Sequence, residues 1–427
     1  MKKWLRLFHN WVNQGLLHIF GSSIIAQVAG IISSVVVIRN LPKLEYGFYV
    51  DANNIYSYLA VFIGLGFTSA ILQYCSERIS EHKKMAIYRY SALFGAIGNI
   101  AIAFIIVFIS IMKSCFGDGI VADYLLMMAG IPFVSYTFSY MSIVLRVRKN
   151  NRMFAYANIA YSVTILVGNI ILTLLIGIPG LIITQYIANV VGTLVCSYKL
   201  QRDGFLSSVF HSTMLLEKTD KKEITNYALI CAITNFASTA LVLIDVTCLG
   251  IVLGDSTVLA DYKVASTIPT ACAFIPTCLT TFFYPRLVES ISISKHEGRR
   301  MVNQLGKIYL GINGTVYVGL AIAAKVIIWV IFGSKYMNIL PIFEVLCFNF
   351  LIQSIKKLLG NTIAAVKRVR VNLIISIISG VLNIVLNLTF IPRFGSIGAA
   401  AATTLVGLIT LSMEWAYLQK YWKEKNE

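Results

Sequence analysis

Residues 91–112 read SALFGAIGNIAIAFIIVFISIM, a run of 22 residues without a charged side chain. A transmembrane helix needs about 20 consecutive, mostly apolar residues, so this stretch is long enough to cross a bilayer. Comparable runs recur along the whole chain. Of the 427 residues, 57% are hydrophobic and 13% are charged, whereas soluble globular proteins carry about 25% charged residues. The sequence therefore predicts an all-α integral membrane protein.

The apolar runs predict about twelve transmembrane helices. Each run is long enough to span the bilayer, and no large soluble domain fits between neighbouring runs. The expected spans are residues 20–38, 46–72, 86–112, 121–145, 154–176, 178–198, 224–250, 256–283, 308–332, 338–360, 371–391 and 396–419.

Basic residues are concentrated in alternate connections. With the N-terminus placed inside, the cytoplasmic segments hold 29 of the 36 lysines and arginines, and the outer segments hold seven. Cytoplasmic loops of membrane proteins carry such an excess of positive charge. The pattern predicts that both termini are cytoplasmic, and it accounts for the net charge of +17 without nucleic-acid binding.

Four regions are expected along the chain. Residues 1–20 are basic and amphipathic and should form an interfacial helix on the cytoplasmic leaflet. Six spans should then form an N-terminal lobe at 21–198. A polar cytoplasmic linker is expected at 199–223, and six further spans should form a C-terminal lobe at 224–427.

The two halves carry a related segment. Residues 169–180, NIILTLLIGIPG, resemble residues 383–392, NIVLNLTFIP, and both lead into a helix rich in small residues. Two halves of six spans keep the same orientation in the membrane. They should therefore be related by an axis along the membrane normal, with a central substrate cavity at their interface.

Polar side chains inside the predicted spans are candidates for the wall of that cavity. They are costly in a membrane, and close helix packing is the competing explanation. Asp245 is the sharpest candidate, because it is a carboxylate well inside an apolar run. The candidates on one face of the first or the seventh helix are Gln27, Asn235, Ser238 and Asp245.

Three lysines of the second half are further candidates. Lys263 lies near the outer end of the eighth helix, and Lys356 and Lys357 lie on the tenth. For the last two, snorkelling to the cytoplasmic surface is the competing explanation.

Polar stripes repeat on the fifth and the eleventh helices. For these stripes we expect close helix packing rather than contact with a substrate. They comprise Asn158, Ser162, Asn169 and Thr173 in the first half, and Asn372, Ser376, Ser379, Asn383 and Asn387 in the second.

Motifs for catalysis and metal binding are missing from the sequence. It has neither a GxxxxGK[ST] phosphate loop nor an HExxH motif, and its five histidines and eight cysteines are dispersed. No outer connection is long enough to house an acid–base pair. We therefore expect no enzymatic activity, no catalytic residue, no metal site and no cofactor.

Three motifs together resemble one family of transporters. Arg39, Leu41 and the Tyr46-Gly47-x-Tyr49 segment follow the first helix, and a run from Tyr262 through Pro285 to Leu287 covers the eighth. Asn383, Leu386, Asn387, Pro392, Phe394, Gly395, Gly398, Ala399 and Ala400 form the third. In this order, the motifs are similar to the polysaccharide-transport branch of the multidrug/oligosaccharidyl-lipid/polysaccharide (MOP) exporter superfamily, which includes Wzx-type O-antigen flippases.

The resemblance implies two six-helix lobes around a central cavity that opens alternately to each side. It implies transport of an undecaprenyl-pyrophosphate-linked oligosaccharide, a repeat unit of lipopolysaccharide O-antigen or of a capsule, across the bacterial inner membrane. Membrane lipids, a polysaccharide polymerase and a chain-length regulator are the implied partners.

The resemblance also suggests roles for single residues. Arg39 and Lys263 are the candidates for cations that meet the pyrophosphate, and aromatic residues such as Tyr56, Tyr58 and Tyr136 would meet the sugar. Related flippases of the peptidoglycan precursor carry several arginines within the first helix. Here only the terminal Arg39 is present, which makes that precursor a poorer match.

Three other functions compete with this interpretation. A multidrug or cation antiporter of the same superfamily tends to carry a carboxylate in its first helix; here only Asp245, in the seventh, is available. A membrane glycan polymerase needs a substantial outer loop, and a sugar symporter of the major facilitator type needs a GxxxDRxGR-like loop; both are missing. Asp245 is expected to pair with a cavity cation or to take up the coupling proton, and the coupling ion, H⁺ or Na⁺, stays open.

Overall fold

The computed structural model describes residues 16–76, 79–210 and 216–423. Within these ranges the regular elements are all helices, and 11 helical segments are long and apolar enough to cross a membrane. The prediction of an all-α integral membrane protein is confirmed. Most of the interfacial helix predicted at 1–20 lies outside the described residues.

Contacts divide the chain into two compact units, Met1–Leu243 and Ile244–Glu427. The division falls inside helix α11 (Lys218–Leu253), so the predicted linker 199–223 lies within the first unit. The start of α11 is bonded to that unit, since Asp220 forms an ion pair of 3.0 Å with Lys83 on α5. Because the start of α11 is bonded to the first unit, the boundary between the two units lies within α11 rather than at the end of the predicted linker.

The first unit contains six candidate spans, two of which are broken. The span predicted at 46–72 is interrupted near Gly64, whose backbone N–H donates to the Asn99 side chain at 2.9 Å. The span predicted at 121–145 is interrupted before Pro132, which stands in the first turn of α7. The elements are α2 (Leu16–Asn40), α3 (Lys43–Ala60), η1 (Ile63–Gly66), α4 (Phe67–Ser76), α5 (Glu81–Cys115), α6 (Gly119–Met128), α7 (Ile131–Val147), α8 (Asn151–Ile176), α9 (Ile178–Arg202), α10 (Phe205–Phe210) and most of α11.

The second unit begins with the last turns of α11. Its eighth predicted span is also broken, because α12 ends at Cys272 and α13 starts at Phe274. The remaining elements are α12 (Ser256–Cys272), α13 (Phe274–Ile293), α14 (Lys295–Ile327), η2 (Ile328–Phe332), η3 (Ser334–Ile339), α15 (Leu340–Ala365) and α16 (Val369–Lys423).

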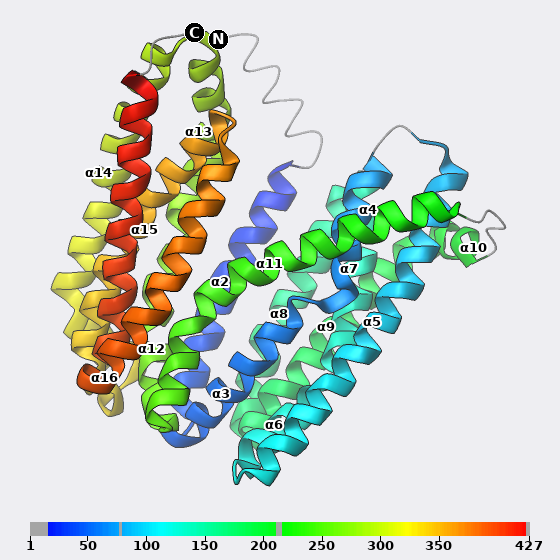
Figure 1. Cartoon of the computed structure of the whole chain (residues 1–427). Helices are drawn as coiled ribbons and strands as arrows, with labels where there is room; N and C mark the ends of the chain where they lie inside the picture. Colours follow the sequence, from blue (N-terminus) through cyan, green and yellow to red (C-terminus); the bar gives the residue numbers. More distant parts are fainter. Residues whose placement is uncertain (1–15, 77–78, 211–215, 424–427) are drawn as a thin grey trace. The chain divides into compact units, whose positions relative to one another are not determined.

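Helix α16 consists of two antiparallel arms that meet at Gly395. That residue has φ 57° and ψ −137°, which no helix contains. Hydrogen bonds join Asn383 to Thr403 at 3.1 Å and Ser379 to Thr410 at 2.6 Å, as expected when a chain folds back on itself. The arms, coloured orange and red in Figure 1, correspond to the spans predicted at 371–391 and 396–419. Eleven continuous segments therefore provide the twelve predicted spans.

The same turn occurs in the first unit between α8 and α9, which also pack along each other (Figure 1). Gly177 there has φ 67° and ψ −139°, nearly the values of Gly395. Three residues later, Gly180 and Gly398 each lie against the backbone of the preceding helix, where a Cβ would collide. The shared turn supports the internal repeat. When the two turn glycines are superimposed, Asn169 aligns with Asn387. Sequence similarity instead aligns Asn169 with Asn383, which lies one helical turn earlier.

Candidate functional site

A buried carboxylate and four neutral polar side chains form one cluster in the second unit. Asp245, near the end of α11, is 6% exposed. Its Oδ2 accepts hydrogen bonds from the Tyr262 hydroxyl at 2.6 Å and the Thr403 hydroxyl at 2.5 Å. Its Oδ1 accepts from the Asn387 amide at 2.8 Å. Helices α11 and α12 and both arms of α16 thus converge on one carboxylate.

A second layer of bonds fixes the amides of this cluster. Asn387 also donates to the Asn383 side-chain oxygen at 2.8 Å, and Asn383 donates to the Thr403 hydroxyl at 3.1 Å. The side-chain oxygen of Asn387 is buried and has no hydrogen-bond partner. The cluster therefore combines a carboxylate with amide and hydroxyl oxygens, the ligand types that hard cations prefer.

The partners of Asp245 are all neutral. Among the described residues, no lysine or arginine lies within ion-pair distance of its carboxylate. A buried charge is costly unless it is paired or fully hydrogen-bonded, and three donors provide the second of these conditions. The arrangement can hold a proton or a small cation at this point of the membrane span.

Lys263 follows Tyr262 on α12 but does not join the cluster. Successive residues of a helix point about 100° apart, so Tyr262 reaches Asp245 whereas Lys263 is exposed. Arg39, at the end of α2 in the first unit, is also exposed. Both side chains therefore lie at the surface of their units.

The two lysines of α15 differ in their surroundings. Lys357 is half-buried and donates to the Thr277 hydroxyl at 2.6 Å. Lys356 is half-buried and lies within electrostatic reach of Glu414, which is 5% exposed and has one carboxylate oxygen without a partner. Sequence reasoning missed Glu414, although it is the one acidic residue of the span predicted at 396–419 and the cost of intramembrane charge would have singled it out.

The first unit contains an open pocket of about 410 Å³ with both polar and apolar residues in its lining. It lies between α2, α8 and α9, close to the predicted candidate Gln27, which is half-buried. The lining residues are Ala26, Gly30, Tyr161, Ser162, Ile165, Asn169 and Gln185. Sequence reasoning assigned Ser162 and Asn169 to helix packing. Asn169 does bond α2 through Ser33, at 2.6 Å, but both residues also line the pocket.

The remaining candidates are scattered within the first unit. Asn235 and Ser238 are exposed on α11, where the Ser238 hydroxyl donates to the Thr234 carbonyl of its own helix at 3.1 Å. Tyr136, expected to meet a sugar, is instead buried and donates to the Ser91 carbonyl at 2.5 Å. Tyr56 is buried as well.

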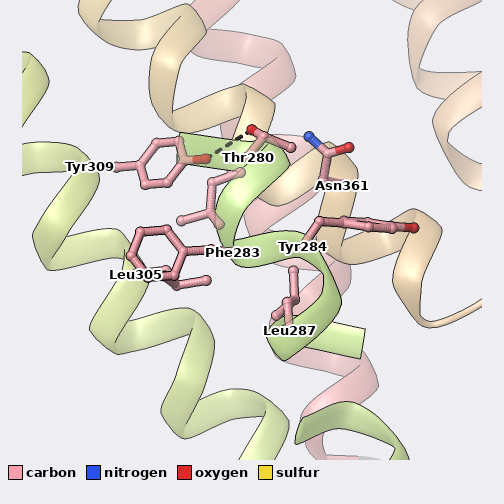
Figure 2. A pocket seen from close by; sticks show the side chains of 8 residues that line it. Thr280, Phe283, Tyr284, Leu287, Leu305, Tyr309 and Asn361 are labelled. Atoms are coloured by element: carbon pink, nitrogen blue, oxygen red, sulfur yellow. Dashed lines mark hydrogen bonds between the residues drawn. The ribbon is translucent and has the colours of Figure 1, made fainter. Parts of the chain in front are cut away.

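A second cavity, in the second unit, is too small for a ligand. Figure 2 shows it among the side chains of α13, α14 and α15, where the Tyr309 and Thr280 hydroxyls bond at 2.8 Å. Its volume is about 10 Å³, and a single water already needs about that much space. It is a packing gap rather than a binding site.

Comparisons with known proteins agree with this architecture. A family model described as polysaccharide biosynthesis protein matches residues 12–291, about two thirds of the chain. A probable low-salt glycan biosynthesis flippase of Haloferax volcanii, Agl15, is 27% identical over 105 residues. That match covers 25% of this chain and only 22% of the relative's length.

Two solved structures share the fold over nearly the whole chain. An inward-facing multidrug resistance MATE family transporter of the MOP superfamily has a TM-score of 0.76 at 13% identity, with 93% of this chain and 94% of the other covered. The lipid II flippase MurJ, in an inward closed conformation, has a TM-score of 0.69 at 16% identity, with 94% and 87% covered. This chain therefore has the fold of the MOP transporters.

Proposed function

The chain belongs to the family of polysaccharide biosynthesis proteins, and on that basis we propose that it is a flippase for a lipid-linked oligosaccharide. The substrate is an O-antigen or capsule-type repeat unit on undecaprenyl pyrophosphate, carried across the bacterial inner membrane by alternating access. Both termini face the cytoplasm. The two structural relatives are a flippase and a transporter.

The observation that carries the proposal is the family match over residues 12–291, and the Asp245 cluster adds a site for a coupling ion. A carboxylate placed inside a membrane helix is expensive and marks a functional site. Here it is held by three neutral donors, and none of the residues that the structure describes pairs a cation with it. Such a site suits a transporter that takes up and releases a coupling ion, H⁺ or Na⁺, during each cycle.

Lys263 and Arg39 bind the pyrophosphate in this proposal, and both are exposed. One charge pair at about 4 Å, in an effective dielectric of about 20, contributes roughly 4 kcal/mol before desolvation. Lys263→Ala should then abolish glycan export at normal protein abundance, whereas Lys263→Arg retains much of it because the charge survives. Lys325→Ala, on α14, is the matched control and exports normally. Normal export by Lys263→Ala would assign the pyrophosphate to Arg39 alone.

Gene deletion tests the function as a whole. Loss of the protein should remove a surface polysaccharide, while lipid-linked repeat units accumulate on the cytoplasmic leaflet. Membrane lipids surround the protein, and a polymerase and a chain-length regulator act on the product at the outer face.

A multidrug or cation antiporter is the second candidate. The higher TM-score to a MATE transporter and the intramembrane carboxylate favour it. Unchanged surface glycan together with reduced resistance to cationic dyes in the deletion strain would select this function instead.

A further inference from the structure

The pocket of the first unit occupies the position that the Asp245 cluster occupies in the second. Asn169 precedes the turn glycine Gly177 by eight residues, as Asn387 precedes Gly395. Gln185 and Thr403 each follow their glycine by eight residues. Asn169 and Gln185 line the pocket, and Asn387 and Thr403 bind Asp245.

The two hairpins differ in the side chains that a third helix presents to them. Helix α2 packs along α8, whereas α11 reaches α16 through the Asp245 side chain. In the second unit, α11 presents the Asp245 carboxylate, which fills the space and uses the donors. In the first unit, α2 presents only Ala26 and Gly30 to the pocket. A Cβ added at Gly30 would meet nothing within 4 Å, so the space beside it is open.

The pocket wall contains four polar side chains and no charged one. Its polar members are Tyr161, Ser162, Asn169 and Gln185, and none of the lining residues is ionisable at neutral pH. An ionised phosphate or an organic cation would lie there without a counter-charge, which is costly in a membrane. The wall therefore selects neutral ligands.

Several groups of the wall suit a ligand rich in hydroxyls. The side-chain oxygen of Asn169 is buried without a hydrogen-bond partner, while its amide nitrogen is held by Ser33 at 2.6 Å. A ligand hydroxyl would satisfy this buried acceptor once the Asn169 side chain turned its oxygen toward the pocket. Tyr161 stacks on Phe138 with ring centroids 5.1 Å apart, which fixes its orientation at the wall.

We propose that this pocket binds a sugar ring of the transported glycan, through Asn169, Gln185 and Tyr161. Its volume of about 410 Å³ lies in the range of about 300–1,000 Å³ that small-molecule sites occupy. The assignment rests on the proposed flippase function and adds a division of labour to it. The first unit binds the neutral sugar, and the second unit binds the coupling ion.

Gly30→Leu tests this assignment, because it places a branched side chain in the pocket without a backbone clash. Gly21→Leu is the matched control, since it lies on the same helix, also has nothing within 4 Å of its added Cβ, and does not line the pocket. Binding to the purified full-length proteins is measured with two probes. One is the lipid-linked oligosaccharide fraction extracted from the host cells, and the other is sugar-free undecaprenyl pyrophosphate.

The expected result is at least a tenfold loss of affinity of Gly30→Leu for the glycan-bearing lipid, with unchanged affinity for the sugar-free lipid. Gly21→Leu should bind both probes like the wild type. An equal loss for both probes, or no loss for either, would overturn the pocket as a sugar site while leaving the flippase proposal intact. If the wild-type protein did not bind the glycan-bearing lipid, the flippase proposal itself would fail.

Discussion

The hairpins α8–α9 and α16 have the same turn, but one borders an open, uncharged pocket and the other closes around a carboxylate. Beside α16 the neighbouring helix contributes Asp245, and the polar groups of the hairpin close around it. Beside α8–α9 the neighbouring helix contributes Ala26 and Gly30, and the polar groups of the hairpin border an open pocket. One duplicated scaffold thus provides a charged, closed site in one unit and a neutral, open site in the other. The residue that a third helix presents to the hairpin is Asp245 at the closed site and Gly30 at the open one.

Removing the charge from the closed site should have the largest effect. Asp245→Asn keeps the size of the side chain but exchanges a carboxylate that accepts three hydrogen bonds for a neutral amide. Hydrogen bonds to a charged group contribute about 1.5–3 kcal/mol each, so ion-driven transport in proteoliposomes should fall by roughly tenfold or more. Runs with a Na⁺ gradient at constant pH, and with a H⁺ gradient in the absence of Na⁺, identify the ion.

The control for this variant is Asp255→Asn, at the N-terminus of α12. Asp255 caps the helix by accepting from the Thr257 backbone at 2.8 Å, and asparagine caps a helix equally well. It should therefore transport normally. Transport by Asp245→Asn at the wild-type rate would mean that the carboxylate is structural, and the two sites would no longer differ in function.

The sequence predicts the membrane-spanning helices better than it predicts the two sites that they form. Continuous apolar runs and the alternation of basic loops predict the spans, including two arms where the structure has the single element α16. Asp245 is also predictable, because an intramembrane carboxylate is rare and expensive. Gly64 and Pro132 show the limit, since the helix breaks beside them depend on tertiary contacts such as the bond to Asn99.

Neutral polar residues are where sequence reasoning fails. Asn387 and Asn169 both read as packing residues, because an asparagine in a membrane helix satisfies either role. Whether it binds a carboxylate or borders a cavity depends on the residue opposite, which is Asp245 in one unit and Gly30 in the other. The pairing of helices that brings them together is set by the fold and is not visible in any local pattern.

Introducing a charge into the open site should have an intermediate effect. Asn169→Asp places in the first unit the chemistry that the second unit already has, without the donors that Asp245 receives from Tyr262 and Thr403. The carboxylate would lie beside an incoming neutral sugar and lose the amide that now bonds Ser33. Glycan export should fall about threefold to tenfold, given about 0.5–1.5 kcal/mol for each neutral hydrogen bond lost. Asn158→Asp is the control, because Asn158 lies on the same helix α8, one turn before Ser162, and is not part of the pocket lining. Equal export by the two variants would contradict a sugar site in this pocket.

The smallest effects are expected at the shared turn, where they test whether the two sites are equivalent at all. Gly177 and Gly395 have positive φ with ψ near −138°, a conformation that is essentially restricted to glycine and costs other residues about 1–3 kcal/mol. Gly177→Ala and Gly395→Ala should therefore lower the melting temperature in detergent by similar amounts, about 2–4 °C for each kcal/mol in a unit of this size. Gly306→Ala, in the helical part of α14 with open space at its Cβ, should not lower it. A marked loss at only one of the two turns would break their equivalence, and with it the alignment of Asn169 with Asn387 on which the comparison of the two sites depends.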